Sequence, residues 1–209
     1  MELRDASEAE SQLLAELLSE RYIHELLMLY EIGQSLCSIH DLDRLLRFSI
    51  ERVVTLLGVE SSAVMLLDEE RQELYFKVAD NIHSDMGQKF QELRFPADQG
   101  IAGWVVREGV SALVSDVEQD SRFYRGVDKQ TGMKTKSYLC VPLKTKDRIL
   151  GALSAVNKRK ASFSEDDVRL LEFLAGPLAI AIENARLIQE LQTAQERLRE
   201  HSFGTRLGR

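Results

Sequence analysis

The stretch from Phe123 to Leu143, FYRGVDKQTGMKTKSYLCVPL, constrains the fold of this chain more than any other segment. It begins with polar residues punctuated by glycine and then becomes an apolar run of residues that favour β-structure. That change is typical of a loop hinged onto a buried strand. We therefore predict a mobile lid over residues 120–136 that covers part of the domain.

The bulk composition indicates one domain with helical extensions. The 209 residues allow a core domain of about 150 residues. The chain is 44% hydrophobic and 29% charged, without an apolar run long enough to cross a bilayer. Its net charge of −7 disfavours nucleic acid, since phosphate binding needs clustered positive charge. The start, MELRDASEAE, lacks a signal-peptide layout. We expect a cytoplasmic protein with neither a nucleic-acid nor a membrane partner.

Hydrophobic periodicity predicts an α+β fold. Helices are expected over residues 7–37, from Asp41 to Leu57, over GIAGWVVREG at 100–109, and from Ser164 onwards. Strands are expected at residues 62–68, 73–80, 93–95, 112–117, 137–144 and 148–157. Short turns join several of these strands, which favours antiparallel pairing. The sequence therefore predicts a six-stranded, mostly antiparallel sheet layered against N- and C-terminal helices.

Two helical arms flank the predicted sheet. We divide the chain into an N-terminal helical extension (1–21), a domain (22–187) and a coiled-coil-like C-terminal extension with a frayed tail (188–209). The last helix carries apolar residues at spacings of seven, or of three and four, which are typical of a coiled-coil seam: Phe173, Ile180, Leu187, Leu191, Ala194 and Leu198. The arms would pair within one chain or across two, and we favour a homodimer. Alternatively, the stripes only cover the sheet.

The start of the last helix carries several signals at once. Ser164 is a suitable cap, Asp167 stands at the third helical position, and Phe163 can pack onto Val168. These residues are therefore expected to have a structural role.

The order of these elements from about Leu26 to Leu187 resembles that of a GAF domain, the small-molecule sensor module of phosphodiesterases, bacterial cyclases and signalling kinases. The segments PADQGIAGWV, FYRGVDKQTG, YLCVP and AVNK are similar to the cyclic-nucleotide-binding branch of that family. The branch signature is matched by Asn157, Lys158, Phe163 and Asp167, whereas Val168 replaces its Glu. The resemblance implies that Lys158 and Asp167 form a salt bridge beneath the pocket.

The resemblance also implies a set of ligand-binding residues. The backbone of Ile101 and Ala102 would meet a phosphate at a helix start, where the helix dipole favours negative charge. Matches to the branch's other contacts comprise four lid residues and one strand residue, namely Tyr124, Asp128, Thr131, Thr135 and Asp80. Each also has a structural interpretation, because threonines around Gly132 can satisfy turn hydrogen bonds and Tyr124 can pack the lid. Trp104 is expected to pack on the core side of its helix.

Base recognition is where this sequence departs from the branch. The aromatic residue that stacks on the purine corresponds to Ala79, and two polar positions correspond to Ala63 and Ser154. Losing the aromatic plane removes about 1 kcal/mol of stacking. This departure favours a phosphate-bearing ligand other than a cyclic purine nucleotide, or a pocket that binds nothing. The retained phosphate and lid contacts favour a small, anionic or nucleotide-like ligand, with a cyclic nucleotide as the leading candidate.

No catalytic constellation, metal site or cofactor site is recognisable in the sequence. The two cysteines, Cys37 and Cys140, have no CxxC spacing, and the four histidines show no metal-binding spacing. Free methionine sulfoxide reductases share the fold but use several cysteines, so this enzyme is a remote alternative. We expect a non-enzymatic sensor that acts on a separate or downstream output protein. The main alternative is a dimerisation or scaffold module with a vestigial pocket.

Overall fold

The computed structural model describes residues 39–81 and 93–204, and within these ranges the strands form one six-stranded sheet. The strand order is β3-β2-β1-β6-β5-β4, and every pairing is antiparallel. The prediction of a six-stranded α+β fold is thus confirmed. The strands are β1 (Val59–Asp68), β2 (Glu73–Asn81), β3 (Arg94–Pro96), β4 (Ala112–Val114), β5 (Tyr138–Lys144) and β6 (Ile149–Lys158).

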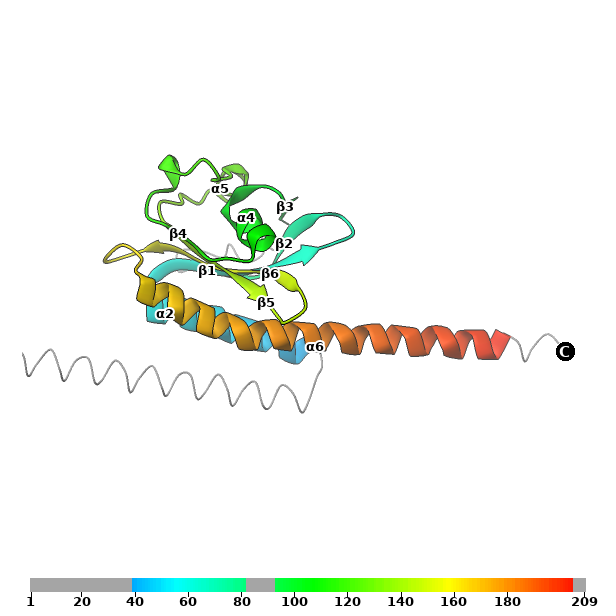
Figure 1. Cartoon of the computed structure of the whole chain (residues 1–209). Helices are drawn as coiled ribbons and strands as arrows, with labels where there is room; N and C mark the ends of the chain where they lie inside the picture. Colours follow the sequence, from blue (N-terminus) through cyan, green and yellow to red (C-terminus); the bar gives the residue numbers. More distant parts are fainter. Residues whose placement is uncertain (1–38, 82–92, 205–209) are drawn as a thin grey trace, which may run out of the picture.

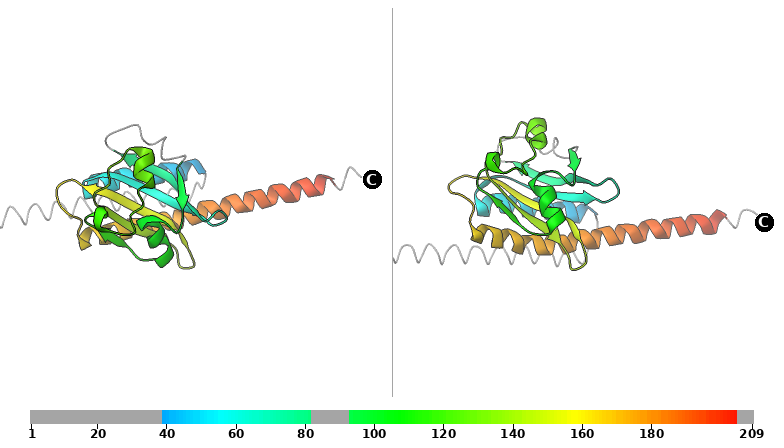
Figure 2. Two further views of the ribbon diagram at one scale, coloured as in Figure 1. Left: turned by 90° about the horizontal axis from the view of Figure 1, so that it is seen from above. Right: turned by 45° about the horizontal axis from the view of Figure 1, so that its top comes forward.

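Helices cover the two faces of this sheet unequally. The long helices α2 (Ile39–Leu57) and α6 (Glu165–Gly204) lie on one face. On the other face lie α4 (Gly100–Glu108), the 3-10 turn η1 (Val117–Gln119) and the short helix α5 (Gly126–Thr131) (Figures 1 and 2). We refer to these as the helix side and the lid side of the sheet.

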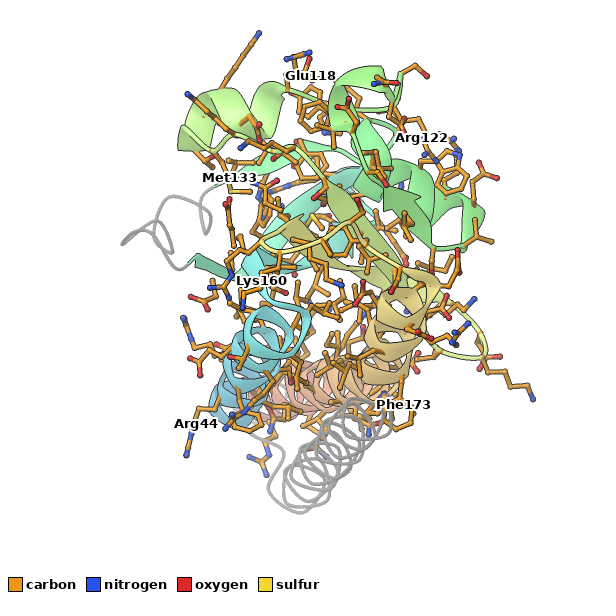
Figure 3. All side chains as sticks on the ribbon, turned by 90° about the vertical axis from the view of Figure 1, so that its left-hand side faces the viewer. Arg44, Glu118, Arg122, Met133, Lys160 and Phe173 are labelled. Carbon is orange, nitrogen blue, oxygen red and sulfur yellow. The ribbon has the colours of Figure 1, made fainter. Side chains whose placement is uncertain are left out.

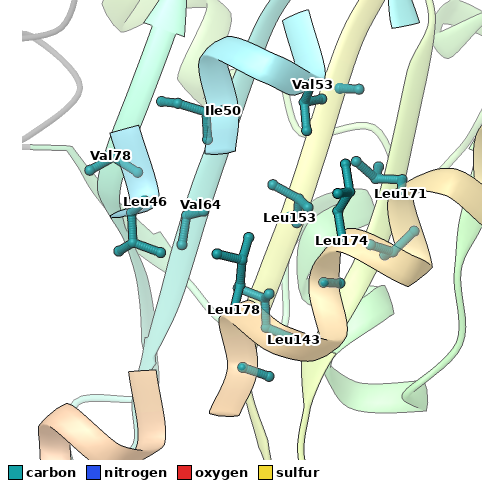
Figure 4. Packing of buried hydrophobic residues seen from close by; sticks show 14 of the residues in the cluster. Leu46, Ile50, Val53, Val64, Val78, Leu143, Leu153, Leu171, Leu174 and Leu178 are labelled. Carbon is teal, nitrogen blue, oxygen red and sulfur yellow. The ribbon is translucent and has the colours of Figure 1, made fainter. Parts of the chain in front are cut away.

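The helix-side core is a continuous layer of aliphatic side chains. Aliphatic side chains from α2 and α6 meet those of the four central strands, β2, β1, β6 and β5, as Figure 4 shows for Leu46, Val64 and Leu153. Each fully buried aliphatic side chain contributes about 1.5–3 kcal/mol relative to an exposed one. This layer therefore holds α2 and the first half of α6 against the sheet.

Two helix boundaries differ from the sequence prediction. Helix α2 begins at Ile39, before the expected cap at Asp41. Helix α6 runs through Pro177 and ends at Gly204, so residues 201–204, expected in a frayed tail, are helical. The helix predicted over residues 7–37 lies outside the described residues. Among the described residues, no helix has the length and hydropathy needed to span a bilayer.

The start of α6 contains the reciprocal capping contacts expected from its sequence. The Ser164 N–H and hydroxyl donate to Asp167 Oδ2 at 2.8 and 3.1 Å, and the Asp167 N–H donates to Ser164 Oγ at 3.4 Å. Lys158 Nζ at the end of β6 approaches the same carboxylate oxygen at 2.5 Å. Phe163 is buried in the helix-side core, and Val168 packs against that core. Asp167 therefore joins the sheet to its exit helix.

Replacing Asp167 by alanine is expected to lower the free energy of unfolding by about 2 kcal/mol, because it removes a cap and leaves Lys158 without its partner. The matched control is Asp166→Ala one residue earlier, whose ion pair with Arg169 is exposed and should contribute less than about 0.5 kcal/mol. Urea denaturation followed by circular dichroism measures both. Equal losses in the two variants would contradict a structural role for Asp167.

Candidate functional site

The two ends of the lid are held together by a backbone hydrogen bond. The Val117 N–H donates to the Lys136 carbonyl oxygen at 2.9 Å, so the start and the end of the lid lie next to each other. Between them the chain forms α5, a helix inside the segment that the sequence analysis interpreted as a loop. The C-cap of α5 is Gly132 with φ 77°, a conformation that glycine adopts without strain.

A cavity of about 60 Å³ lies between the lid, α4 and the lid side of the sheet. This volume holds only a few waters, since one water needs roughly 10–15 Å³ of such space. Its walls come from β1, β2, β3, β5, β6, α4 and the lid: Ser61, Ala63, Met65, Phe76, Phe95, Gly100, Ile101, Ala102, Phe123, Tyr124, Val127, Asp128, Met133, Thr135, Tyr138, Ser154 and Val156. Figure 3 shows Met133 on the lid side, across the sheet from Phe173 of α6.

The first turn of α4 forms one edge of the cavity. Ile101 and Ala102 are buried there, and Gln99, the N-cap, provides no side-chain hydrogen bond to the helix. The first N–H groups of a helix lack partners within the helix and carry partial positive charge. This edge therefore favours a negatively charged or strongly hydrogen-bond-accepting group.

Two lid residues that line the cavity are hydrogen-bonded to each other. Asp128 Oδ1 accepts a hydrogen bond from the Thr135 hydroxyl at 2.7 Å, and Asp128 Oδ2 accepts one from the Thr135 N–H at 2.8 Å. Both residues line the cavity. Their side chains thus fasten α5 to the segment that enters β5, and a change at either residue alters the lid and the cavity together.

Five aromatic residues line the cavity, namely Phe76, Phe95, Phe123, Tyr124 and Tyr138. The rings of Phe95 and Tyr124 are stacked with centroids 6.0 Å apart, and Phe76 lies 6.0 Å from Phe95 in a tilted arrangement. Sequence reasoning looked for an aromatic at Ala79 and missed this group. In the sequence, Phe76 alternates with Tyr75 and Lys77 along β2, which indicated a buried position for Phe76. The aromatic group as a whole was not recognisable, because its members come from segments far apart in the chain.

Two titratable side chains at or near the cavity, Tyr138 and Cys140, stay uncharged. Burial raises the pKa of the Tyr138 hydroxyl well above its ordinary value, and the Asp128 carboxylate acts in the same direction. Burial likewise raises the pKa of the Cys140 thiol, which lies below the cavity in the lid-side core. A thiol in this state is a poor nucleophile, because the reactive form is the thiolate.

Asn157 connects the lid to the central strands. Its Nδ2 donates to Glu60 Oε2 at 2.8 Å and to the Lys134 carbonyl oxygen at 2.9 Å. Its Oδ1 accepts from the N–H groups of Lys136 at 2.7 Å and Ser137 at 3.2 Å. The residue has φ 56°, a left-handed conformation that asparagine tolerates better than most residues. Asn157 is therefore the anchor of the lid's C-terminal end.

The structure does not bring two of the predicted ligand-binding residues to the cavity. Thr131 is buried and its hydroxyl donates to the Val127 carbonyl oxygen at 2.8 Å, as in the structural interpretation of this residue. Asp80 pairs with Ser62, and strand alternation places it on the face that carries Val78, on the helix side. Neither residue lines the cavity.

The positions that correspond to base recognition lie at or near the cavity, and Trp104 lies on α4. Ala63 and Ser154 line the cavity, while Ala79 packs beside it. Trp104 is half-buried and packs against the lid-side core, as predicted, and the Arg122 guanidinium lies 4.3 Å from its ring centroid. Arg122 in turn forms two side-chain hydrogen bonds with Asp120, which hold the pKa of that carboxyl below its ordinary value. This contact fastens the outer side of the lid to α4.

Residues 39–183 match the family model of the GAF domain. Among curated proteins, the chain is 28% identical over 153 residues to the probable 3',5'-cyclic phosphodiesterase pde-5 of Caenorhabditis elegans, covering 69% of this chain and 21% of that protein. It is 38% identical over 111 residues to the dual 3',5'-cyclic-AMP and -GMP phosphodiesterase 11A of Takifugu rubripes, covering 52% of this chain and 12% of that protein. The chain thus spans about a fifth or less of these relatives.

Solved structures share the fold. The GAF domain from an Acinetobacter phosphoenolpyruvate-protein phosphotransferase has a TM-score of 0.64 at 20% identity, covering 80% of this chain and 96% of that one. Free methionine-R-sulfoxide reductase from Neisseria meningitidis has a TM-score of 0.63 at 20% identity, covering 81% and 93%. Likeness at these identities concerns the fold alone. Because the family model spans residues 39–183, most of the sequence, this chain belongs to the GAF domain family.

Proposed function

We propose that this GAF domain is a signal-transduction sensor that binds a cyclic nucleotide beneath the lid. The observation that carries the proposal is the cavity itself, which is lined both by the uncapped first turn of α4 and by the Asp128–Thr135 pair. Similarity to curated cyclic-nucleotide phosphodiesterases supports this ligand class. In the bound state, the N–H groups of Ile101 and Ala102 would receive the phosphate, and the aromatic group around Phe95 would replace the missing aromatic at Ala79.

Ligand entry requires the lid to move. The cavity of about 60 Å³ is far below the roughly 300–1,000 Å³ of typical small-molecule pockets. Tyr124 and Met133 of the lid contribute to its walls. Displacement of these side chains with α5 would enlarge the cavity without disturbing the sheet. A ligand that prefers the displaced lid would then shift the protein between two arrangements.

Helix α6 is the proposed output of the sensor. It packs on β5 and β6 through its first half and is joined to β6 by Lys158 and Asp167. Pairing of α6 with a second copy would transmit a lid movement to a separate or downstream output protein. We propose a cytoplasmic homodimer for this role.

The second candidate is a scaffold module that dimerises without a ligand, and the small, largely apolar cavity favours it. A reductase function has weaker support, because Cys140 is buried with a raised pKa. We therefore propose that the domain is not an enzyme.

Cyclic AMP or cyclic GMP is expected to raise the melting temperature of the chain. A ligand at about one hundred times its Kd stabilises the folded state by about 2.7 kcal/mol. Asp128→Ala and Thr135→Ala should each weaken binding by about tenfold, and the double variant should lose no more than either single variant, because the residues act as one pair. Isothermal titration calorimetry measures these affinities.

The control for these variants is Glu118→Ala. This carboxylate of η1 is exposed, and neither it nor its partner Arg125 lines the cavity, so its loss should leave the Kd unchanged. A thermal-shift screen that also contains cyclic dinucleotides, linear nucleotides and acidic metabolites tests other anionic ligands. If no cyclic nucleotide raises the melting temperature, the proposed ligand is overturned and the scaffold module is favoured.

A further inference from the structure

The two sides of α6 carry different apolar surfaces. One side packs into the helix-side core through Leu171, Leu174, Leu178 and Ile182. The other side exposes large apolar residues, whose exposed fractions run from 43% at Ile180 to 71% at Leu198. The exposed set consists of Phe173, Ile180, Leu187, Leu191 and Leu198. We call this set, with Asn184 and Ala194 between its members, the α6 seam.

The seam follows a heptad repeat. Ile180, Leu187 and Ala194 take one core position, which we assign as d, and they recur every seven residues. Asn184, Leu191 and Leu198 take the other core position, a. Figure 1 shows that this part of α6 extends well beyond the sheet. Most of the stability of a helix in a protein comes from packing of its apolar face, so the exposed seam of the projecting part favours a partner.

Asn184 is the one polar residue of the seam, and it restricts the direction and register of the helix that can pair with α6. A side-chain amide in an apolar interface costs free energy unless it finds a hydrogen-bond partner. A second copy aligned in the same direction and register places another Asn184 opposite, so that the two amides bond to each other. A slip of one heptad would place Leu191 there instead, and an antiparallel helix would present an apolar d residue.

We propose that α6 pairs with α6 of a second copy of this chain as a parallel, two-stranded coiled coil whose register is set by Asn184. The flanking positions agree with this geometry. Glu183 would face Ile188 of the second copy, and Glu190 would face Gln195, so neither position opposes like charges. The inference rests on the proposed pairing of two chains and is independent of the ligand.

A coiled coil of this kind couples the two sensors directly. The core side of α6 stays on the sheet while its seam stays on the other copy. A shift of α6 in one copy therefore reaches the other without a change of register, since a slip would separate the two amides.

Cysteine crosslinking tests direction and register in the full chain. On a Cys37→Ser background, Leu187→Cys and Ala194→Cys are made as differently tagged chains, mixed and oxidised. A parallel, in-register pair gives 187–187 and 194–194 disulfides and at least about tenfold less of the mixed 187–194 product. Gln189→Cys, an exposed residue on the opposite side of α6, is the control and should crosslink poorly. Equal amounts of mixed and matched products, or equal crosslinking at Gln189, would overturn the proposal.

Asn184→Leu tests the role of the amide itself. Two leucines pack across the seam without desolvating polar groups, so the dimer Kd should fall by about tenfold or more while the mixed 187–194 product increases. Gln189→Leu is the matched control and should change neither quantity. A weaker dimer, or an unchanged crosslinking pattern, would overturn the role of Asn184. These readouts need no nucleotide, so a failed ligand screen and a failed coiled coil are distinguishable.

Discussion

Asn157→Ala is expected to lower the free energy of unfolding by about 3–4 kcal/mol and to loosen the lid. The substitution removes the bonds to Glu60 and Lys134 and leaves the N–H groups of Lys136 and Ser137 without their acceptor. Each unsatisfied buried group costs about 1–3 kcal/mol. An alanine in the left-handed conformation adds about 1 kcal/mol.

Asn157→Gly separates these two contributions. Glycine tolerates φ 56° but has no amide, so it should recover only the roughly 1 kcal/mol of backbone strain. Urea denaturation gives the stabilities, and hydrogen exchange of the Lys136 and Ser137 amides reports the lid directly. Destabilisation below 1 kcal/mol for alanine, or full recovery with glycine, would show that the side-chain amide does not anchor the lid.

Gly151→Ala is the second large effect, with an expected loss of about 3 kcal/mol or more. Gly151 lies in β6 opposite Leu66 of β1, at the centre of the sheet. An added Cβ would lie 2.0 Å from the Met65 carbonyl oxygen and 2.9 Å from Leu66 Cα. These are backbone atoms, so relief requires β1 and β6 to separate.

Gly126→Ala is the matched comparison. Its added Cβ would meet the ring of Tyr124 at 2.2–2.4 Å, which is a side chain that can rotate away. We expect a stability loss of about 1 kcal/mol, the typical cost of an off-rotamer side chain, with displacement of Tyr124 from its stack on Phe95. Soluble yield and urea denaturation check both variants. A Gly151→Ala chain as stable as Gly126→Ala would contradict the close approach of β1 and β6.

Local features of the structure were predictable from the sequence. The capping contacts between Ser164 and Asp167 involve residues within one helical turn, and they are present. The α4 helix begins after Gln99 and ends at Gly109, as its glycines and periodicity predicted. Such features depend on neighbouring residues, so a single sequence contains the necessary information.

The contents of the site were predicted less well, because they depend on contacts between distant segments. The bulge between Val64 and Met65 and the strand register determine that Asp80 lies on the helix side. Phe76, Phe95 and Tyr124 come from β2, β3 and the lid, and no local pattern relates them. The lid helix α5 was missed because six residues are too few for a clear periodic signal.

The sequence by itself determined the order of helices and strands, the start of α6 and the heptad spacing of its seam, since each follows from periodicity or capping over a few residues. Only the tertiary structure decided that the seam is exposed, that Asn157 holds the end of the lid, and that the cavity is small and aromatic. Packing of several distant segments sets these properties, because the volume and exposure at a point depend on every side chain around it.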